Sequence, residues 1–545
     1  MASTATTPCE IRSLMSSRAG TVNYNLAQDF YRNALVNSGR LALSAGGRNL
    51  SYRELAALAQ SVAAWLPRGA DGRGGRVGIL GSRSFEACVG VLGTCWAGGT
   101  YVPISLKLPE ARVRDVFERA GLSALIVDTG GTRLLSEQVL SAAPRRILVP
   151  DKSRLPPHFG DTIADFGSLT SDGGPTEPVP VRGDDIAYIE FTSGTTGVPK
   201  GVMIPAGAVH HYRMVMQERY GFTADDRIAE TADLCFDVSV SNMFTTWAAG
   251  ASLHVVPTTQ AMAPAKFIQE HALTVWFSVP SIIAMLQQMR LLSAGAFPTL
   301  RYSMFIGEPL ATRSALAWRA AAPNSSIDNL YGPTEATVAC LGQRIEIPPL
   351  VTPERDAIAI GRPFPGTEAA IVGPMQDSLP PGTVGEIALA GVQLAAGYLD
   401  APDLTASRFP TIAGKRWYLT GDLGRQDASG VFHHLGRIDN QVKVMGNRVE
   451  LEEIDSHLQA VSHSALAVAV AWPVSHGTAS GITAFVADTE LEPAQIKDAL
   501  RHRLPSYAVP TAVYRIRAMP MTASGKVDRK ALLATLEREH ELRST

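Results

Sequence analysis

The sequence of 545 residues lacks the features of several protein classes. Its five cysteines form no CxxC pair and have no neighbouring histidine group, so neither a zinc site nor a disulfide framework is indicated. The longest apolar stretch, Ala465 to Val474, has about half the length of a membrane helix and predicts a buried strand. Met1 to Gly20 contains no apolar core flanked by basic residues. We therefore expect no secretory signal and no membrane contact, and a cytoplasmic location.

The sequence also lacks a large excess of charge of one sign. The formal net charge is −2 and charged residues make up 18% of the chain, with both signs mixed. A nucleic-acid-binding protein would carry a basic patch or stripe. Nucleic acid is therefore not expected as a partner.

What the sequence does contain is an alternation of short apolar runs with longer helical patterns. The chain is too long for one ordinary core, so two or more domains are expected. Alternating strands and helices predict doubly wound α/β layers. The runs that carry this prediction are Arg76–Leu80, Ala124–Val127, Thr274–Phe277 and Tyr302–Ile306.

The pattern changes twice toward the C-terminus. Between Glu368 and Leu399, two apolar runs separated by a Pro-Pro-Gly turn predict a small antiparallel β unit. After Gly436, apolar residues at helical spacing alternate with strands, which predicts a compact α+β domain of about 100 residues.

The run from Phe191 to Gly201, FTSGTTGVPKG, follows a strand-like segment and combines small hydroxyl residues, glycines and one lysine. Gly194 and Gly197 allow backbone N–H groups to close around an anion, to which the hydroxyls and Lys200 add donors. The order differs from GxxxxGK[ST], because a proline precedes the lysine and no hydroxyl follows it. The loop is therefore predicted to bind phosphate, but not as a P-loop.

This loop closely resembles the TSGTTGxPKG signature of the adenylate-forming superfamily, which includes acyl-CoA synthetases, luciferases and the adenylation domains of nonribosomal peptide synthetases. The resemblance to amino-acid adenylation domains runs from about Leu50 to Lys530, with the motifs in family order. The further matching motifs are LSYREL at 50–55, AGGTYVPI at 97–104, FDVSV at 236–240, NLYGPTE at 329–335, YLTGDL at 418–423, GRIDNQVK at 436–443, LPSY at 504–507 and SGKVDR at 524–529.

The resemblance implies a large N-terminal domain, residues 1–435, with two doubly wound sheets and a small β-barrel. A hinge at 436–440, with Asp439 as the pivot, would join it to a mobile α+β domain at 441–545. It also implies ATP and Mg²⁺ as cofactors. Thr334 and Glu335 would serve the α-phosphate and Mg²⁺, and Lys526 would be the mobile catalytic cation. The remaining ATP-binding residues implied are Thr192, Ser193, Gly194, Thr195, Thr196, Gly197, Lys200, Tyr331, Asp422 and Arg437.

Asp237 in FDVSV distinguishes this chain from acyl-CoA synthetases, because in amino-acid adenylation domains this aspartate pairs with the substrate ammonium. Apart from Asp237 and Lys526 the implied lining is neutral, which favours a small or medium side chain such as Ala, Val or Pro and leaves Ser or Thr open. The implied substrate-binding residues are Asp237, Val238, Ser241, Ser278, Met304, Ile306, Leu330, Val338 and Ala339.

The resemblance implies a second step, transfer of the acyl group to the phosphopantetheine thiol of a carrier protein. The sequence has no room for a carrier domain, so we expect a freestanding ligase with a separate carrier in natural-product biosynthesis, such as antibiotic biosynthesis. An excised domain and a requirement for an MbtH-like protein stay open. The alternatives are an acyl-CoA or aryl-acid ligase of the same superfamily and an inactive carrier-binding homologue. The presence of Lys200, Glu335, Asp422, Arg437 and Lys526 disfavours the inactive homologue.

Overall fold

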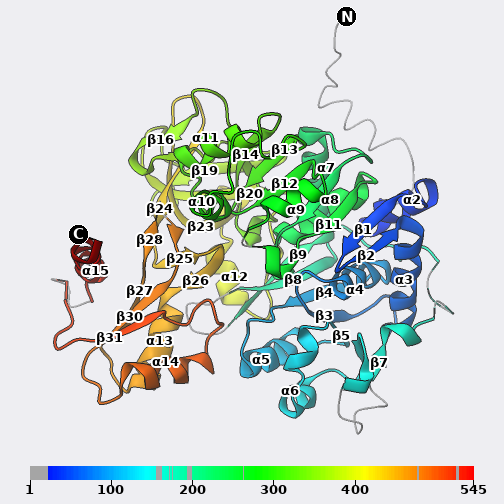
Figure 1. Ribbon diagram of the computed structural model, residues 1–545, viewed down its shortest axis with the longest axis horizontal. Coiled ribbons are helices and arrows are strands. Elements are labelled where there is room, and N and C mark those ends of the chain that lie inside the picture. The colour runs from blue at the N-terminus through cyan, green and yellow to red at the C-terminus, as the bar shows by residue number, and fades with distance from the viewer. Residues whose placement is uncertain are drawn as a thin grey trace, which may run out of the picture.

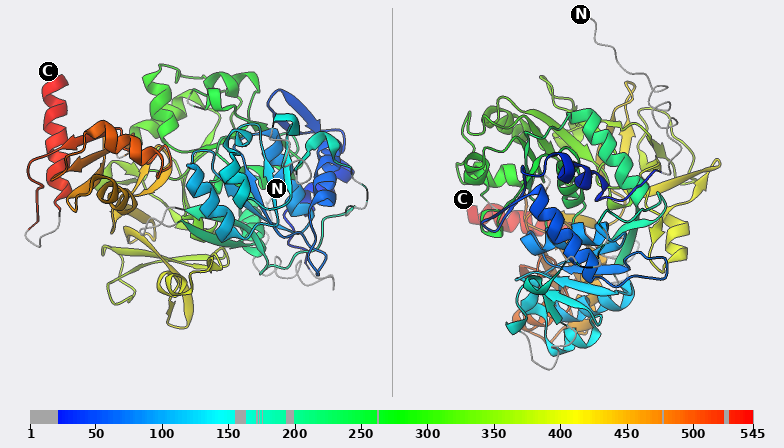
Figure 2. Two further views of the ribbon diagram at one scale, coloured as in Figure 1. Left: turned by 90° about the horizontal axis from the view of Figure 1, so that it is seen from below. Right: turned by 90° about the vertical axis from the view of Figure 1, so that its right-hand side faces the viewer.

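The computed structural model describes residues 22–154, 163–170, 172, 174, 176–192, 199–261, 263–475, 478–522 and 527–544. A large N-terminal domain contains two mixed sheets covered by helices and a third, antiparallel sheet. A small C-terminal domain (orange to red) lies at one end of the molecule (Figures 1 and 2). The predicted α/β class is therefore confirmed.

The first sheet is parallel through its centre, and β9 and β21 continue it antiparallel at one edge. Strands buried on both faces consist of nearly continuous apolar runs, as in Ala124–Val127. In spatial order its described strands are β21 (Gly397–Tyr398), β9 (Lys200–Pro205), β8 (Ile186–Thr192), β4 (Thr100–Ile104), β3 (Arg76–Leu80), β5 (Ala124–Val127), β6 (Ile147–Val149) and β7 (Ile163–Asp165).

The helices of this half begin at recognisable caps. Ser51 accepts a hydrogen bond from the Glu54 backbone, and the Glu54 carboxylate accepts one from the Ser51 backbone, which forms a capping box. Ser84 caps the next helix in the same way through its hydroxyl. The helices associated with this half are α2 (Gln28–Val36), α3 (Tyr52–Trp65), α4 (Phe85–Trp96), α5 (Glu110–Ala120) and α6 (Glu137–Ala142).

The second sheet is also parallel at its centre and antiparallel at both edges. In spatial order its described strands are β18 (Arg362–Pro363), β15 (Leu341–Arg344), β14 (Ser326–Tyr331), β13 (Tyr302–Phe305), β12 (Val275–Ser278), β10 (Arg227–Glu230), β11 (Ser252–Val255), β1 (Leu41–Ala45) and β2 (Arg48–Ser51). Its helices are α7 (Ala206–Tyr220), α8 (Val238–Ala248), α9 (Ala265–Glu270), α10 (Ser281–Gln288) and α11 (Thr312–Ala321).

The β unit predicted between Glu368 and Leu399 belongs to the third sheet, which is antiparallel. Its described pairings give the order β19-β20-β23-β22 with β24 beside β23. The bounds are β19 (Thr367–Val372), β20 (Gly385–Gly391), β22 (Thr411–Ile412), β23 (Lys415–Gln426) and β24 (Phe432–Arg437). Close by in sequence are β16 (Val351–Thr352), β17 (Ala357–Ile358) and α12 (Pro402–Arg408).

The small domain has two sheets of its own and three described helices. The helical spacing noted after Gly436 corresponds to α13, whose buried residues include Ile454 and Leu458. The predicted buried strand at 465–474 corresponds to β27. The bounds are β25 (Gln441–Val444), β26 (Asn447–Glu450), β27 (Ala467–Ala471), β28 (Val474–Ser475), β29 (Thr478–Ala479), β30 (Ile482–Val486), β31 (Ala512–Arg515), α13 (Leu451–Ser462), α14 (Pro493–Arg501) and α15 (Arg529–Ser544).

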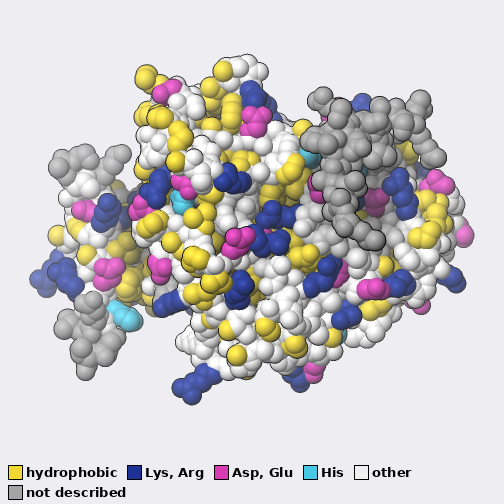
Figure 3. All heavy atoms as spheres, turned by 90° about the horizontal axis from the view of Figure 1, so that it is seen from above, with side chains coloured by type: hydrophobic (Ala, Val, Ile, Leu, Met, Phe, Trp, Pro, Cys, Tyr) yellow, Lys and Arg dark blue, Asp and Glu magenta, His cyan; other side chains and the backbone are white. Residues whose placement is uncertain are grey.

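The surface and the helices agree with the composition. On the face in Figure 3, cationic, anionic and hydrophobic side chains are interspersed over the described residues. No helix among the described residues combines the length and the apolar character needed to cross a membrane. Of the cysteines, Cys88, Cys95, Cys235 and Cys340 are free thiols, and Cys9 lies outside the described residues.

Candidate functional site

A cavity of about 690 Å³ lies where the two mixed sheets meet the small domain. Its size is typical of a small-molecule site. The ends of β8 and β14 and the start of α8 contribute to its wall, and the small domain covers it with β25 and β26. Because the carboxyl ends of parallel strands meet at one edge of a sheet, residues distant in sequence come together here.

The predicted phosphate loop starts and ends at paired residues. Thr192 ends β8 and Lys200 begins β9, and the two are partners in the antiparallel register. The Thr192 hydroxyl is buried and has no hydrogen-bond partner among the described residues. Burial lowers the pKa of Lys200, whose Nζ lies 3.7 Å from Oε1 of Glu450 in the small domain. Ser193, Gly194, Thr195, Thr196 and Gly197 lie outside the described residues, so their predicted roles are untested.

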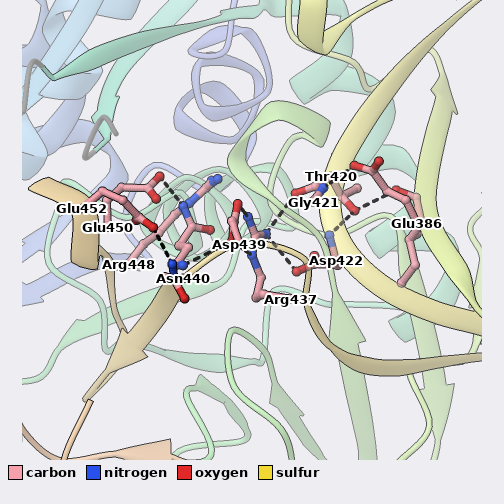
Figure 4. A network of polar contacts seen from close by, with 12 residues as sticks. Glu386, Thr420, Gly421, Asp422, Arg437, Asp439, Asn440, Arg448, Glu450 and Glu452 are labelled. Atoms are coloured by element: carbon pink, nitrogen blue, oxygen red, sulfur yellow. Dashed lines mark hydrogen bonds and ion pairs between the residues drawn. The ribbon is translucent and has the colours of Figure 1, made fainter. Parts of the chain in front are cut away.

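A second group, predicted to bind the nucleoside, centres on Asp422. Tyr331 donates a hydrogen bond from Oη to Asp422, and Arg437 donates from Nη1 to Oδ1 of Asp422 at 2.9 Å. Burial alone would raise the pKa of Asp422, but His434 and Arg437 together hold it well below its usual range. The carboxylate is therefore ionised and already oriented by Tyr331, His434 and Arg437, of which Figure 4 shows Arg437.

The backbone before Asp422 needs a glycine. Gly421 has a φ of +75°, and a Cβ there would come within 2.7 Å of Nη2 of Arg437. Gly421 also donates its N–H to Oε1 of Glu386 at 2.7 Å (Figure 4). A side chain at this position would strain the backbone and displace Arg437.

Between these two groups lies the turn that carries Thr334 and Glu335. Glu335 is fully buried; it accepts a hydrogen bond from Tyr398 Oη at 2.9 Å and one from Nη1 of Arg448 at 3.1 Å. Burial would raise the pKa of Glu335, but the Arg448 guanidinium lowers it below the usual value. A buried, ionised carboxylate thus directly follows Thr334, which lines the cavity.

This carboxylate fits the predicted magnesium role. Mg²⁺ is commonly held by one or two carboxylates together with substrate phosphates. Glu335 supplies an anionic oxygen ligand directly after Thr334, and Thr334 lines the cavity together with Thr192 and Pro199 from the two sides of the predicted phosphate loop. Among the described residues no group of three or more His, Cys, Asp or Glu side chains could hold a metal without such phosphates.

Asp237, predicted to pair with a substrate ammonium, lies at the start of α8 on the cavity wall. Its side chain does not cap that helix; instead Oδ2 accepts a hydrogen bond from the Val338 N–H at 3.2 Å. Thr337 and Val338 both have a left-handed backbone, with φ of +57° and +63°, which is rare for β-branched residues. Burial raises the pKa of Asp237 to about 6.

Only part of the predicted amino-acid pocket lines this cavity. Asp237, Val238, Ser278, Ile306 and Leu330 are on its wall. Ser278 accepts a hydrogen bond from Trp276 Nε1 at 2.8 Å. The other predicted residues, Ser241, Met304, Val338 and Ala339, are buried and are not brought to this wall.

The wall also carries charges that the sequence argument missed. Glu190, 4% exposed, points from β8 into the same region, and Glu308 and Lys443 line the cavity as well. Burial, with Asp237 and Glu335 nearby, raises the pKa of Glu190 well above its usual value. Glu190, Glu308 and Lys443 were not among the predicted pocket residues, and the neutral lining of the amino-acid pocket itself stays a prediction. Successive side chains of a strand alternate between its faces, so Glu190 shares the cavity face with Thr192, a signal available in the sequence.

Of the predicted hinge residue and the predicted catalytic lysine, only the hinge residue lies in the described part of the chain. Asp439 accepts hydrogen bonds from Nε and Nη2 of Arg437 at 2.8 and 2.6 Å, just before β25 (Figure 4). Lys526 lies outside the described residues, so its role is untested. The hairpin β25–β26 instead brings Lys443 and Arg448 to the cavity. Burial lowers the pKa of Lys443.

Comparison with known proteins gives a consistent result. Residues 30–399 match the family described as AMP-binding enzyme, and residues 453–526 match the AMP-binding enzyme C-terminal domain. Tyrocidine synthase 1 of Brevibacillus parabrevis is 31% identical over 93% of this chain and 45% of its own length. Surfactin synthase subunit 1 of Bacillus subtilis is 33% identical over 93% of this chain and 13% of its own length. The chain thus spans less than half the length of these curated relatives.

Among solved structures, the adenylation domain AlmE of Vibrio cholerae, in complex with glycyl-adenosine-5′-phosphate, superposes with a TM-score of 0.86. It is 30% identical, and the match covers 96% of this chain and 99% of that one. The structure of holo-PA1221, which contains adenylation and PCP domains, shares the fold at 23% identity, with a TM-score of 0.78 over 94% of this chain and 84% of that one.

Proposed function

The chain belongs to the AMP-binding enzyme family as an adenylation domain of the nonribosomal peptide synthetase type, and we propose that it activates a small or medium neutral amino acid with ATP. A carboxylate oxygen of the amino acid would attack the α-phosphorus of ATP. The bond from that phosphorus to the bridging oxygen would break, releasing pyrophosphate and leaving aminoacyl-AMP. The observation that carries this proposal is that Asp237, Thr334 and Asp422 line one cavity, and that the buried carboxylate of Glu335 directly follows Thr334.

The nucleotide would lie along the wall from Asp422 to the phosphate loop. Asp422, already ionised, would accept hydrogen bonds from the ribose hydroxyls, Arg437 would support it, and Tyr331 would pack on adenine. Lys200 and the unpaired Thr192 hydroxyl are suited to the phosphates, with the loop residues Ser193 to Gly197 between them. Magnesium bound at Glu335 would offset charge on the phosphates.

The amino acid would be held at its ammonium by Asp237 and at its carboxylate by Lys526 on the mobile domain. A buried ammonium needs a charged partner, which Asp237 can provide because its carboxylate does not form a capping hydrogen bond with helix α8. Val238, Ile306 and Leu330 limit the side chain to modest size, and Ser278 is the polar member of the lining. The raised pKa of Glu190 favours its neutral form, so this side chain adds no charge that could pair with a charged substrate side chain. The glycyl adenylate named for AlmE is consistent with a small substrate.

A second half-reaction would transfer the acyl group to the phosphopantetheine thiol of a carrier protein. The thiol sulfur would attack the carbonyl carbon, its proton would leave to solvent, and AMP would depart. Lys200 and Glu335 are paired here with Glu450 and Arg448 of the small domain. Because both groups are proposed to serve pyrophosphate and magnesium in the first step, this orientation suits the second step. Rotation about Asp439 would exchange the two orientations.

ATP–pyrophosphate exchange with a panel of amino acids tests this proposal. The expected result is exchange above background with one or a few small or medium neutral amino acids. Exchange only with a fatty or aryl acid, with CoA as acceptor, would favour the acyl-CoA or aryl-acid ligase. No exchange with any acid would favour an inactive carrier-binding homologue.

A further inference from the structure

The small domain contacts the large domain at a second place, where α5 of the large domain meets α13. Nη2 of Arg112 donates a hydrogen bond to Oε1 of Glu453 at 2.6 Å. The same Nη2 lies 3.1 Å from Nε2 of His457, and Nε of Arg112 donates to the Arg503 carbonyl at 3.4 Å. One guanidinium of the large domain therefore binds three residues of the small domain.

The backbone adds to this contact. The Ser506 N–H donates to the Lys107 carbonyl at 3.2 Å, which joins the segment before α5 to the segment after α14. Tyr507, partly buried, follows directly and lines the edge of the cavity together with Cys235 of the large domain, as do Arg112 and Glu453. The interdomain contact thus has a polar centre with an aromatic side chain beside it.

Burial makes the ion pair sensitive to loss of either partner. Arg112 and Glu453 are 7% and 8% exposed. A buried ion pair contributes little net stability, but removing one partner leaves an uncompensated buried charge. Glu450, which is also anionic, lies close enough to repel Glu453, so Arg112 is needed to balance that carboxylate.

The pair also depends on orientation. Arg112 and Glu453 belong to different domains, so rotation of the small domain about Asp439 would separate them. A contact that exists in one of two orientations shifts the population toward that orientation by its differential free energy. The Arg112–Glu453 pair accompanies the orientation in which Arg448 binds Glu335.

We propose that Arg112 is a positioning residue that, through Glu453, holds the small domain in the orientation used for acyl transfer to the thiol. This inference rests on the proposed function for its chemical step. The Arg112–Glu453 contact should affect the two half-reactions differently, because the small domain must leave this contact for adenylation and keep it for acyl transfer.

The test compares Arg112→Met and Glu453→Gln with the wild type and with Arg529→Met. Arg529→Met is the matched control, because it also removes an arginine from an ion pair, but that pair, with Asp455, lies inside the small domain and not between the domains. Pyrophosphate exchange reports adenylation with the best amino acid of the panel. Transfer to free pantetheine, followed by mass spectrometry of the thioester, reports the second half-reaction.

Arg112→Met and Glu453→Gln are expected to slow thioester formation by about tenfold or more, with exchange within about twofold of the wild type. Arg529→Met should leave the ratio of the two rates unchanged. An equal fall in both rates, or no fall in either, would overturn the proposal. If Arg112→Met does not fold, the nearly isosteric Glu453→Gln gives the same comparison.

Small-angle X-ray scattering tests the contact independently of catalysis. Loss of Arg112 or Glu453 should broaden the distribution of interatomic distances, and Arg529→Met should not. If the wild type activates no amino acid, the proposed function fails while scattering still decides the role of Arg112. Unchanged scattering in both interdomain variants would contradict that role.

Discussion

Arg448 of β26 donates a hydrogen bond from Nη1 to Oε2 of Glu335 at 3.1 Å, joining the small domain to the GPTE turn of the large domain. The guanidinium thus lies against the carboxylate that is proposed to bind magnesium. Glu450, two residues further along, approaches Lys200 in the same way. Two charged groups proposed for ATP chemistry are therefore occupied by the small domain, which links its orientation to the stage of the reaction.

Glu335→Gln should lower pyrophosphate exchange by about 10²–10³-fold, because a neutral amide binds magnesium less well than a carboxylate. Raising the magnesium concentration should recover part of the rate. A magnesium titration of the exchange rate measures this. Glu354→Gln, at an exposed ion pair with Arg425, is the control and should behave as wild type. An unchanged magnesium dependence in Glu335→Gln would contradict the assignment.

Asp237→Asn should reduce kcat/KM for the amino acid by about 10²–10³-fold, since the substrate ammonium would lose its charged partner. The KM for ATP should change little. Steady-state exchange with each substrate varied in turn checks this. Asp225→Asn, at an exposed carboxylate paired with Arg40, is the control. If a fatty or aryl acid is the true substrate, Asp237→Asn should have no such selective effect.

The KM for the amino acid should rise about tenfold for each pH unit below about 6, because Asp237 must be ionised to bind the ammonium. A carboxyl with a raised pKa binds its proton more tightly in the folded state than in the unfolded state. Its contribution to stability therefore falls as pH rises from about 4 to about 6 and is constant above that range. A pH profile of KM measures the predicted rise in KM. If Asp237→Asn leaves that profile unchanged, the titration belongs to another group.

Lys526→Ala should lower exchange by about 10²–10³-fold, the usual cost of removing one preorganised charge donor. Lys497→Ala is a control in the same domain, because Lys497 donates to the Thr511 carbonyl on the surface. Exchange near the wild-type rate in Lys526→Ala would exclude this lysine from the first half-reaction.

Asp439→Pro should hold the small domain in one orientation and abolish thioester formation, because a fixed φ prevents the backbone change at the hinge. The substitution also removes the carboxylate that binds Arg437. Asp439→Asn is therefore the control: it alters the Arg437 contact but keeps a flexible backbone. Thioester formation in Asp439→Pro at the rate of Asp439→Asn would exclude a hinge here.

The fold was largely predictable because periodicity reports burial. The apolar runs at Arg76–Leu80 and Ala124–Val127 are strands with those bounds, and Leu451 to Val461 lies in one helix. The cavity wall was less predictable, because it depends on which face of an element turns inward. Met304 lies in β13 and is buried away from this wall, whereas Ile306, just after that strand, lines it.

Glu190 and Arg448 show two different reasons for a missed site residue. Glu190 and Thr192 lie two positions apart in one strand, so their side chains point to the same face. The period of two would therefore have placed Glu190 on the cavity face. Arg448 reaches Glu335 across 113 positions of sequence through the docking of two domains, and no local pattern contains that contact.

Direct detection of the adenylate tests the central claim most sharply. The protein, ATP and magnesium would be incubated with each amino acid and with fatty and aryl acids, and the products identified by mass spectrometry. Aminoacyl-AMP is expected together with pyrophosphate from at least one small or medium neutral amino acid. Acyl-AMP formed only from fatty or aryl acids, or no adenylate from any acid, would contradict that claim.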